Sequence, residues 1–187
     1  ISLFYIMVKI IDQLLPDVFY NRLLKILDDE DNSLNWFWNS KTAENQNGEP
    51  IDDNFMFTHL LYNKDINGKS PFFETFFPIL YFLEGHIPIN NLCRMKLNLY
   101  PNQGEKITHA KHIDLTDGKT KKPLENCTIT ILNFTTCNGG TIIGEEKYLS
   151  KENQALSFDN KIEHQGFTQT DTQRRIVLNI ATTNTTK

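Results

Sequence analysis

The sequence lacks the features that mark secreted, disulfide-stabilised or membrane-spanning proteins. Its 187 residues include only three cysteines, and no two of them form a C-x-x-C pair. A disulfide framework and a structural zinc knuckle are therefore not expected, and a reducing, cytoplasmic location is predicted. No run approaches 18 apolar residues, so no membrane segment and no membrane partner are predicted.

An excess of positive charge is absent as well. Lys and Arg number 19 against 23 Asp and Glu, which gives a formal net charge of -4. This balance counts against a phosphate-binding surface and a nucleic-acid partner. Disorder is also excluded, because 39% of the residues are hydrophobic and 11% are aromatic. The length and the apolar content predict one domain, residues 1–187, with a substantial core.

The N-terminus also lacks the pattern of a signal peptide. The opening stretch ISLFYIM is apolar, but it has no charged segment before it and no small-residue cleavage site. Met7 would serve as an initiator, so residues 1–6 are expected to be an added segment or an upstream reading of the gene.

The first half of the chain has the pattern of helical support. After the start signals Pro16 and Asp17, residues 17–29 predict a helix whose apolar positions are Val18, Leu23, Leu24 and Leu27. Residues 71–84 predict a buried helix that is kinked at Pro78. Residues 41–50 between them predict a polar loop.

From about residue 93 the apolar pattern changes to a period of two. In residues 94–100, Met95, Leu97 and Leu99 face one side, and a polar stripe faces the other: Arg94, Lys96, Asn98 and Tyr100. Further short strands are predicted at 127–134, 141–143, 155–159 and 175–181. Short strands separated by turn signals favour a sandwich or barrel, so the fold class is mainly β with supporting N-terminal helices, α+β in content.

One pair of residues has the spacing of metal ligands. In the sequence THAKHIDL, His112 and Asp114 are two positions apart, and on a strand they would point to the same face. Taken alone, the pair is more often a surface salt bridge, because an H-x-D match arises easily by chance.

A second histidine and an arginine strengthen the case for a metal. His164 follows a predicted strand, and Arg175 opens the last one. Two histidines and one carboxylate fit a facial triad, which suits Fe(II) and leaves positions open for substrates. A buried arginine beside such a triad can bind a carboxylate ligand through two parallel hydrogen bonds.

These residues resemble the 2-oxoglutarate- and Fe(II)-dependent dioxygenases, especially their prolyl-4-hydroxylase-like branch of bacteria and phages. The resemblance runs from about Arg94 to Ala181 and rests on RMKLNLYPNQG, HID, TITILNFTTCNGGTII, NQALSFDN, HQG and RRIVLNI, in the family's order. It implies a double-stranded β-helix, the cupin-like jelly roll, as a core in residues 93–187. Residues 1–92 would then supply helical support and the first strands.

The resemblance also implies roles for individual residues. His112, Asp114 and His164 match the Fe(II) ligands, and an arginine after the distal histidine matches the residue that binds the far carboxylate of 2-oxoglutarate. Strand alternation favours Arg175 over Arg174 for this role, because Arg174 shares its face with an aliphatic stripe.

Two further matches come from the same resemblance. Tyr100 and Asn98 match the strand that contributes hydrogen bonds to the cosubstrate. Gly139 and Gly140, followed by Thr141, resemble a structural turn of the family, for which a left-handed glycine is expected.

The implied function is a dioxygenase that hydroxylates a C–H bond of a peptidyl residue and releases succinate and CO2. Fe(II) and 2-oxoglutarate would be its cofactors and ascorbate a reductant, and its substrate would be a peptide, a protein or a small molecule. Two alternatives stay open. A zinc hydrolase also uses two histidines and a carboxylate, and a jelly-roll binding module would use these residues only structurally.

Other conspicuous residues are given structural interpretations. His109 is expected to be solvated, because Lys111 stands where a second H-x-D pair would need an acid. Trp36 and Trp38 are expected to pack in the core, and Asp159 to cap a turn.

Overall fold

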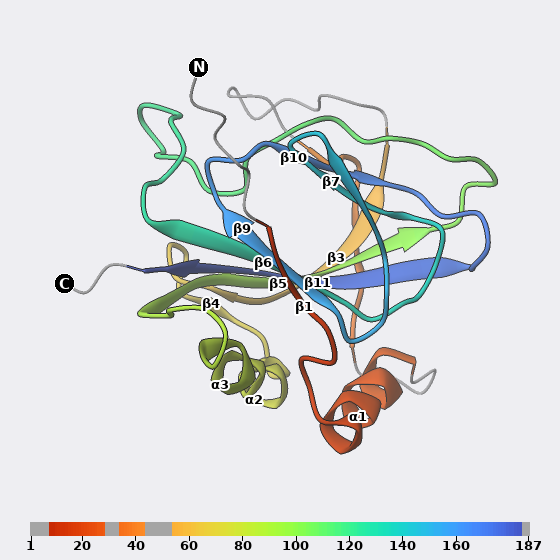
Figure 1. The fold of residues 1–187 in the computed structure, drawn as a ribbon, viewed down its shortest axis with the longest axis horizontal. Helices are drawn as coiled ribbons and strands as arrows, with labels where there is room; N and C mark the ends of the chain where they lie inside the picture. Colours follow the sequence, from red (N-terminus) through yellow and green to blue (C-terminus); the bar gives the residue numbers. More distant parts are fainter. Residues whose placement is uncertain (1–7, 29–33, 44–53, 185–187) are drawn as a thin grey trace.

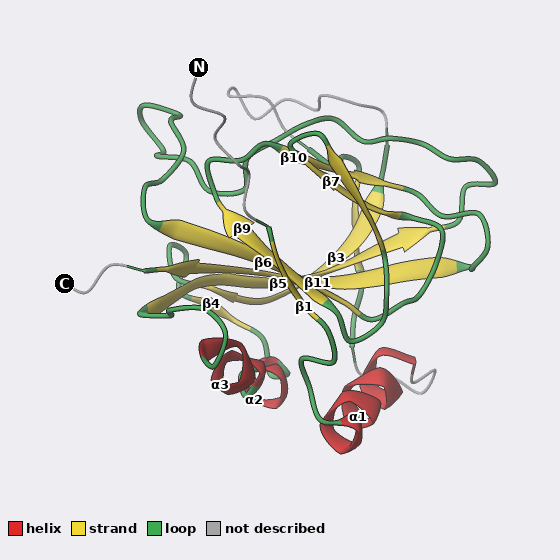
Figure 2. Cartoon of the chain, viewed as in Figure 1, coloured by secondary structure: helices red, strands yellow, loops and turns green. Residues whose placement is uncertain are grey.

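The computed structural model describes residues 8–28, 34–43 and 54–184, and these residues form three layers (Figure 1). A large antiparallel sheet lies in the middle. Three helices lie against one of its faces, and a small sheet that contains β7 and β10 faces the other (Figure 2). Two facing antiparallel sheets make the jelly roll that the sequence predicts.

The large sheet has eight strands. Their order is β1 (Lys9–Ile11), β9 (Ala155–Asp159), β6 (Cys127–Asn133), β11 (Arg174–Thr183), β5 (Asn91–Pro101), β3 (Met56–Asn63) and β2 (Phe37–Asn39), and β4 (Gly68–Lys69) pairs with β3. The small sheet has the order β10 (His164–Phe167), β7 (Gly140–Ile143) and β8 (Glu146–Leu149). The predicted strands of the second half are thereby confirmed as β5, β6, β7, β9 and β11.

The larger apolar core lies between the big sheet and the helices α1 (Asp17–Asp28), α2 (Phe73–Phe76) and α3 (Ile79–Glu84). From the last strand, Ile176, Leu178 and Ile180 enter this core, as their alternation predicts. Val177, on the opposite face of β11, packs instead in a smaller cluster with Ile129 and Ile143. Because β11 is buried on both faces, the side chains on its inner face lie in a protected space between the two sheets.

Two predictions for the helices need correction. Val18 is 87% exposed, and α1 buries Tyr20 together with the predicted Leu23 and Leu27. Val18 precedes Tyr20 by two residues, which is about half a turn around the helix, so the two cannot face the same side. The predicted helix at 71–84 is two short helices, because Pro78 ends one segment and opens α3 as its N-cap.

Several features of the first half were not predicted. The eight-residue strand β3 was missed, although it pairs with the central strand β5. Trp36 packs against the core as expected, whereas Trp38 is 64% exposed on the edge strand β2. Of the loop predicted at 41–50, residues 44–50 lie outside the described residues.

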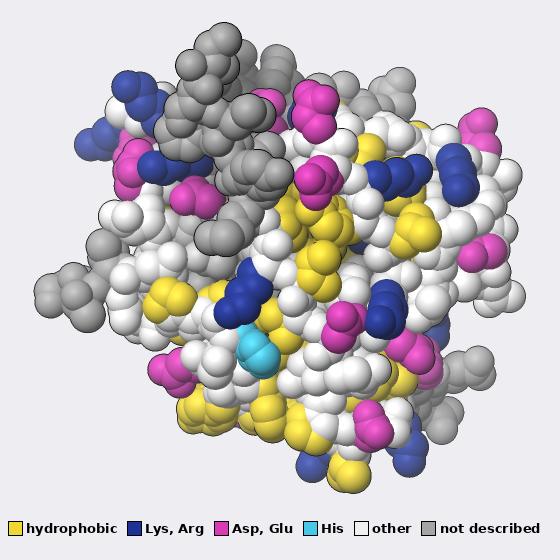
Figure 3. All heavy atoms as spheres, in the orientation of Figure 1, with side chains coloured by type: hydrophobic (Ala, Val, Ile, Leu, Met, Phe, Trp, Pro, Cys, Tyr) yellow, Lys and Arg dark blue, Asp and Glu magenta, His cyan; other side chains and the backbone are white. Residues whose placement is uncertain are grey.

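The surface carries charges of both signs, and the cysteines are not paired in disulfides. On the face drawn in Figure 3, Lys and Arg side chains are interspersed with Asp and Glu, and no extended basic patch forms. The three cysteines are free thiols, and Cys127 and Cys137 are buried. In the described ranges, none of the helices has the length and apolar character that crossing a bilayer demands.

Candidate metal centre and cosubstrate pocket

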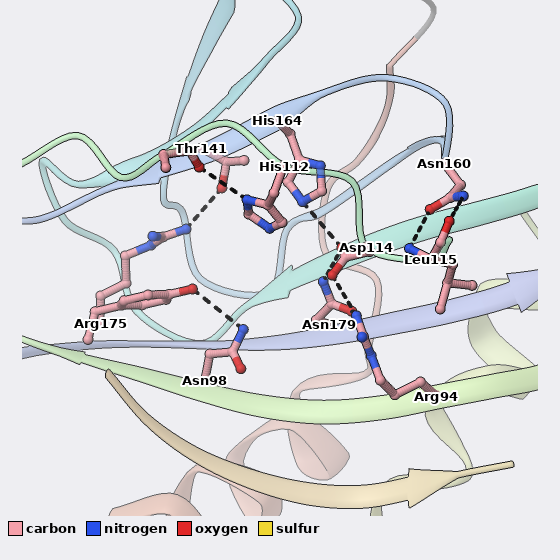
Figure 4. A network of polar contacts seen from close by, with 12 residues as sticks. Arg94, Asn98, His112, Asp114, Leu115, Thr141, Asn160, His164, Arg175 and Asn179 are labelled. Atoms are coloured by element: carbon pink, nitrogen blue, oxygen red, sulfur yellow. Dashed lines mark hydrogen bonds and ion pairs between the residues drawn. The ribbon is translucent and has the colours of Figure 1, made fainter. Parts of the chain in front are cut away.

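The backbone brings the two halves of the predicted metal motif together. The amide of His112 donates to the carbonyl of His164 at 2.9 Å, and the amide of His164 donates to the carbonyl of His112 at 3.1 Å. His164 is the first residue of β10, whereas His112 forms only an isolated bridge to it, so His112 and Asp114 do not lie on a strand as their proposed same-face geometry assumed. The bridge places both imidazoles over the large sheet, where Asp114 joins them (Figure 4).

The three side chains converge closely enough to share one ion. Each of His112, Asp114 and His164 offers a donor atom, and these atoms lie within 4.8 Å of one another. Nε2 of His164 is 3.2 Å from Oδ2 of Asp114. Two ligands about 2.1 Å from an ion and at right angles would lie about 3.0 Å apart, so this spacing fits neighbouring positions of an octahedral site.

The hydrogen bonds around the site prepare the ligands for a cation. Nδ1 of His112 lies 3.2 Å from the carbonyl of Ala110, and donating to that oxygen leaves the lone pair on Nε2. Asp114 is followed by Leu115, whose amide donates to Oδ1 of Asn160 at 3.0 Å, while Nδ2 of Asn160 donates back to the Leu115 carbonyl at 2.8 Å. Asn160 is buried and therefore fixes the chain that carries Asp114.

The electrostatics favour the protonation states that metal ligands need. Burial alone would raise the pKa of Asp114, but the charge of Arg94 and the hydrogen bond with His164 outweigh it and hold this pKa well below its ordinary value. Burial, aided by His164, lowers the pKa of His112. An ionised carboxylate and a neutral imidazole are the forms that bind a metal ion.

Two side chains of the large sheet, Arg94 of β5 and Asn179 of β11, contact the carboxylate of Asp114. Nη2 of Arg94 lies 2.5 Å from Oδ1, and Nδ2 of Asn179 donates to Oδ2 at 2.8 Å. The same Nη2 donates to Oδ1 of Asn179 at 3.1 Å, so the three side chains form a closed ring (Figure 4).

The second end of the site is built around Arg175. This arginine is 2% exposed, and its Nη2 donates to Oγ1 of Thr141 at 3.1 Å. Its guanidinium lies 5.3 Å from the centre of the Tyr100 ring. Burial lowers the pKa of Arg175, and within the described residues its Nε has no hydrogen-bond partner. Such a buried cation is stabilised by an anion.

One cavity joins both ends of the site. Its wall includes the triad at one end and Tyr100, Thr141 and Arg175 at the other. Asn98 lies between them, and its Nδ2 is 3.5 Å from the hydroxyl of Tyr100. Oδ1 of Asn98 is buried without a partner among the described residues. The residues present therefore fit a divalent metal ion together with an anionic ligand.

The two adjacent arginines lie as strand alternation predicts. Arg175 faces the cavity, whereas the side chain of Arg174 is 42% exposed and pairs with Asp28 of α1. His109 is only 3% exposed, so its predicted solvation is wrong. Its ring packs 5.3 Å from the Tyr100 ring, and its amide donates to the carbonyl of Gly166.

The predicted reason for the two turn glycines is also wrong. Among the described residues, the glycines with positive φ are Gly104 and Gly144, not Gly139 or Gly140. A Cβ on Gly140 would lie 2.0 Å from the carbonyl oxygen of Tyr148, and one on Gly139 would lie 2.9 Å from a neighbouring backbone nitrogen. Close packing, against Tyr148 of β8 at Gly140 and against Gln169 at Gly139, requires glycine here, and a left-handed backbone does not.

Four polar residues of the site were missed at the level of sequence: Arg94, Thr141, Asn160 and Asn179. The sequence pattern puts Arg94 on the polar face of its strand without a role and Thr141 in a turn, and it gives Asn160 and Asn179 no role. The alternation of β5 and β11 puts Arg94 and Asn179 on the cavity side. The two residues are not opposite one another, since Asn179 pairs with Lys96 and Arg94 with Ala181. Only the side-chain contacts show that both meet Asp114.

Comparison with known proteins gives a clear result for the fold. No protein-family model matches the chain, and no curated protein matches it in sequence. Solved structures do match. An oxidoreductase of the 2OG-Fe(II) oxygenase family from Burkholderia pseudomallei is 7% identical with a TM-score of 0.65, and the match covers 94% of this chain and 85% of that one.

Two prolyl hydroxylases match over similar lengths. A Pseudomonas putida prolyl-4-hydroxylase is 9% identical with a TM-score of 0.59, covering 97% of this chain and 94% of that one. The viral collagen prolyl hydroxylase of Paramecium bursaria Chlorella virus-1 is 13% identical with a TM-score of 0.56, covering 93% and 94%. The chain thus has the double-stranded β-helix fold of 2-oxoglutarate- and Fe(II)-dependent oxygenases, prolyl hydroxylases among them.

Proposed function

We propose that this protein is a 2-oxoglutarate- and Fe(II)-dependent dioxygenase that hydroxylates a C–H bond of a peptidyl residue. One observation carries the proposal: a His-Asp-His cluster and a buried arginine share one cavity. The cluster suits Fe(II), and the arginine suits the remote carboxylate of a dicarboxylic acid.

In this proposal His112, Asp114 and His164 hold Fe(II). Arg175 binds the remote carboxylate of 2-oxoglutarate, and Thr141 orients the guanidinium through its hydroxyl. Tyr100, at the Arg175 end, and Asn98, between the two ends, contribute polar contacts along the cosubstrate.

Bound Fe(II) supplies the oxygen chemistry, in which O2, 2-oxoglutarate and a C–H bond give succinate, CO2 and an alcohol. The chain itself contributes position and protection. Arg175 fixes the far end of the cosubstrate, so that its keto acid end is held at the triad. Ile131 and Val177 add apolar walls to the cavity and limit the access of water.

The structural neighbours support a peptidyl substrate. Among them is a prolyl hydroxylase from Trichoplax adhaerens solved with a peptide fragment of hypoxia inducible factor, which is 10% identical with a TM-score of 0.59. The mixed charges on the surface of Figure 3 favour a peptide or small molecule over nucleic acid. We also keep ascorbate as the reductant of this enzyme.

Two wider features belong to the same proposal. We infer a cytoplasmic location, because free thiols are typical of a reducing compartment. We also treat residues 1–187 as one oxygenase domain, since β1 to β4 of the first half join the sheet that carries the site.

Anaerobic calorimetry tests the proposal directly. The purified chain should bind one Fe(II) and then one 2-oxoglutarate, and replacing any one of His112, Asp114 or His164 with Ala should abolish tight Fe(II) binding while the fold is retained. Unchanged iron stoichiometry in two of these three variants would contradict the metal assignment. Tight zinc binding without 2-oxoglutarate binding would favour a zinc hydrolase, and binding of no divalent metal would favour a binding module.

A second measurement addresses the substrate. Succinate release is followed with Fe(II), ascorbate and O2 over a panel of proline-containing peptides, free amino acids and small carboxylic acids. Turnover that depends on a peptide supports the peptidyl assignment. Turnover with only free amino acids would replace it while leaving the oxygenase assignment in place.

A further inference from the structure

The polar stripe of β5 includes Arg94, to which the proposed function gives no role. Asn98 and Tyr100 belong to the cosubstrate end, but Arg94 lies at the opposite end, against the metal-ligating carboxylate. The side chains of Arg94 and Asp114 are 17% and 8% exposed, so this is a buried ion pair rather than a surface contact.

The two oxygens of Asp114 have different surroundings. Oδ2 lies 3.2 Å from Nε2 of His164, on the side where the ligand atoms converge. Oδ1 lies 2.5 Å from Nη2 of Arg94, on the side of the sheet. Only Oδ2 therefore faces the metal position, and a guanidinium covers the other oxygen.

Asn179 fixes the arrangement from the neighbouring strand. Its Oδ1 accepts from Arg94, and its Nδ2 donates to Oδ2 of Asp114. With this orientation of the amide, each contact joins a donor to an acceptor, and the reverse orientation would set donor against donor and acceptor against acceptor. Asn179 is 5% exposed and has no room to turn into solvent.

We propose that Arg94, locked by Asn179, is a positioning residue that restricts Asp114 to a single metal-binding oxygen. The inference rests only on the metal-binding half of the proposed function. A carboxylate can bind an ion through one oxygen or through both. An arginine on Oδ1 blocks the second mode because it satisfies that oxygen and repels the cation from that side.

The binding mode of Asp114 determines how many coordination positions of the metal ion stay open to other ligands. An octahedral ion held by two imidazoles and one carboxylate oxygen keeps three positions for other ligands, whereas a carboxylate bound through both oxygens leaves two. The proposed reaction needs three, two for the keto acid end of 2-oxoglutarate and one for O2. Arg94 would thus protect the position that oxygen requires.

The number of metal-bound waters tests this inference without turnover and without cosubstrate. The chain is saturated with Mn(II), and the water-proton relaxation rate per bound ion is measured. Wild type should give the rate for three waters. Arg94→Met should lose roughly one third of the inner-sphere contribution, because one water of three is displaced.

Two control variants isolate the role of Arg94. Arg94→Lys keeps a cation beside Oδ1 and should retain the wild-type relaxation rate. Arg174→Met removes an exposed arginine and its ion pair with Asp28, at the other end of β11, and it should also leave the rate unchanged. A wild-type rate in Arg94→Met, or an equal loss in Arg94→Lys, would overturn the inference.

A crystal structure of the Mn(II)-loaded wild type keeps the inference testable if Arg94→Met does not fold. Oδ2 should lie about 2.2 Å from the ion, with Oδ1 still on Arg94. Both oxygens on the ion would overturn the inference and leave the proposed function standing. Absence of Mn(II) binding to wild type would instead overturn the metal site itself.

Discussion

Two arginines on the neighbouring strands β5 and β11 serve the two ends of the site, and they differ in what neutralises their charge. Arg94, on β5, has a carboxylate partner within the chain, Oδ1 of Asp114 at 2.5 Å. Arg175, on β11, has a hydroxyl and an aromatic ring, and no ion pair with it occurs among the described residues. The charge of Arg94 is neutralised within the folded chain by Asp114, whereas the charge of Arg175 has only neutral partners among the described residues and could be neutralised by an anionic ligand.

Because their partners differ, Arg94 should matter for the stability of the fold and Arg175 for the binding of an anion. A paired buried charge contributes to the folded state, because removing one partner leaves the other uncompensated. An unpaired buried charge lowers stability and raises affinity for an anion. Substitutions at the two arginines should therefore affect different measurements.

The largest effect is expected for the paired arginine. Arg94→Met should lower the free energy of unfolding of the metal-free chain by about 3–5 kcal/mol, because it leaves the buried Asp114 carboxylate without its arginine counter-charge. Arg175→Met should leave this free energy unchanged or raise it. Urea unfolding followed by circular dichroism measures both, and an equal loss in the two variants would remove the distinction.

The unpaired arginine should dominate ligand binding. Arg175→Ala should weaken binding of 2-oxoglutarate to the Mn(II)-loaded chain by about 2–5 kcal/mol, the range for truncating one member of a buried charge pair. Arg174→Ala serves as the matched control and should change the affinity little. Calorimetry without oxygen measures both, and a larger loss for Arg174 would reverse the assignment.

A smaller effect is expected for the hydroxyl that orients Arg175. Thr141→Val removes the hydrogen bond to Nη2 and should weaken 2-oxoglutarate binding by about 0.5–1.5 kcal/mol, the usual contribution of one hydrogen bond. Thr141→Ser keeps the hydroxyl and should bind like wild type. Equal affinity for the Val variant would show that Tyr100 alone is enough to orient the guanidinium.

The smallest effect belongs to the exposed arginine. Arg174 pairs with Asp28 across the surface, with 42% and 59% of the two side chains exposed. Such a pair contributes little, so Arg174→Ala should change the free energy of unfolding by no more than about 0.5 kcal/mol. Urea unfolding at low and high salt checks this, and a loss above 1 kcal/mol at both would show that its aliphatic stem packs on α1.

The sequence predicts the second half of the fold well because its signals are local. Alternation in residues 94–100 and 175–181 is confirmed in β5 and β11, and it correctly points Arg175 inward and Arg174 outward. The first half was harder. The apolar residues of β3 do not alternate cleanly, and Pro78 divides a segment that has uniform helical character.

The sequence predicts those site residues that follow a local spacing or match the family motif, and it does not predict contacts between distant residues. His112 and Asp114 have a local H-x-D spacing and the family resemblance adds His164, whereas the ring that holds Asp114 joins residues from β5 and β11 that are 85 positions apart. Local pattern does not specify such a contact. His109 illustrates the same limit, since its burial depends on packing against Tyr100 from another element.

The backbone bridge between His112 and His164 also has an entropic consequence. The two residues are 52 positions apart in the sequence, and closing a flexible loop of that length costs about 3.5 kcal/mol beyond a constant term. Two amide hydrogen bonds between His112 and His164 hold that loop closed in the folded chain. A metal ion therefore meets ligands whose separation is already fixed, and none of its binding free energy is spent on bringing distant parts of the chain together.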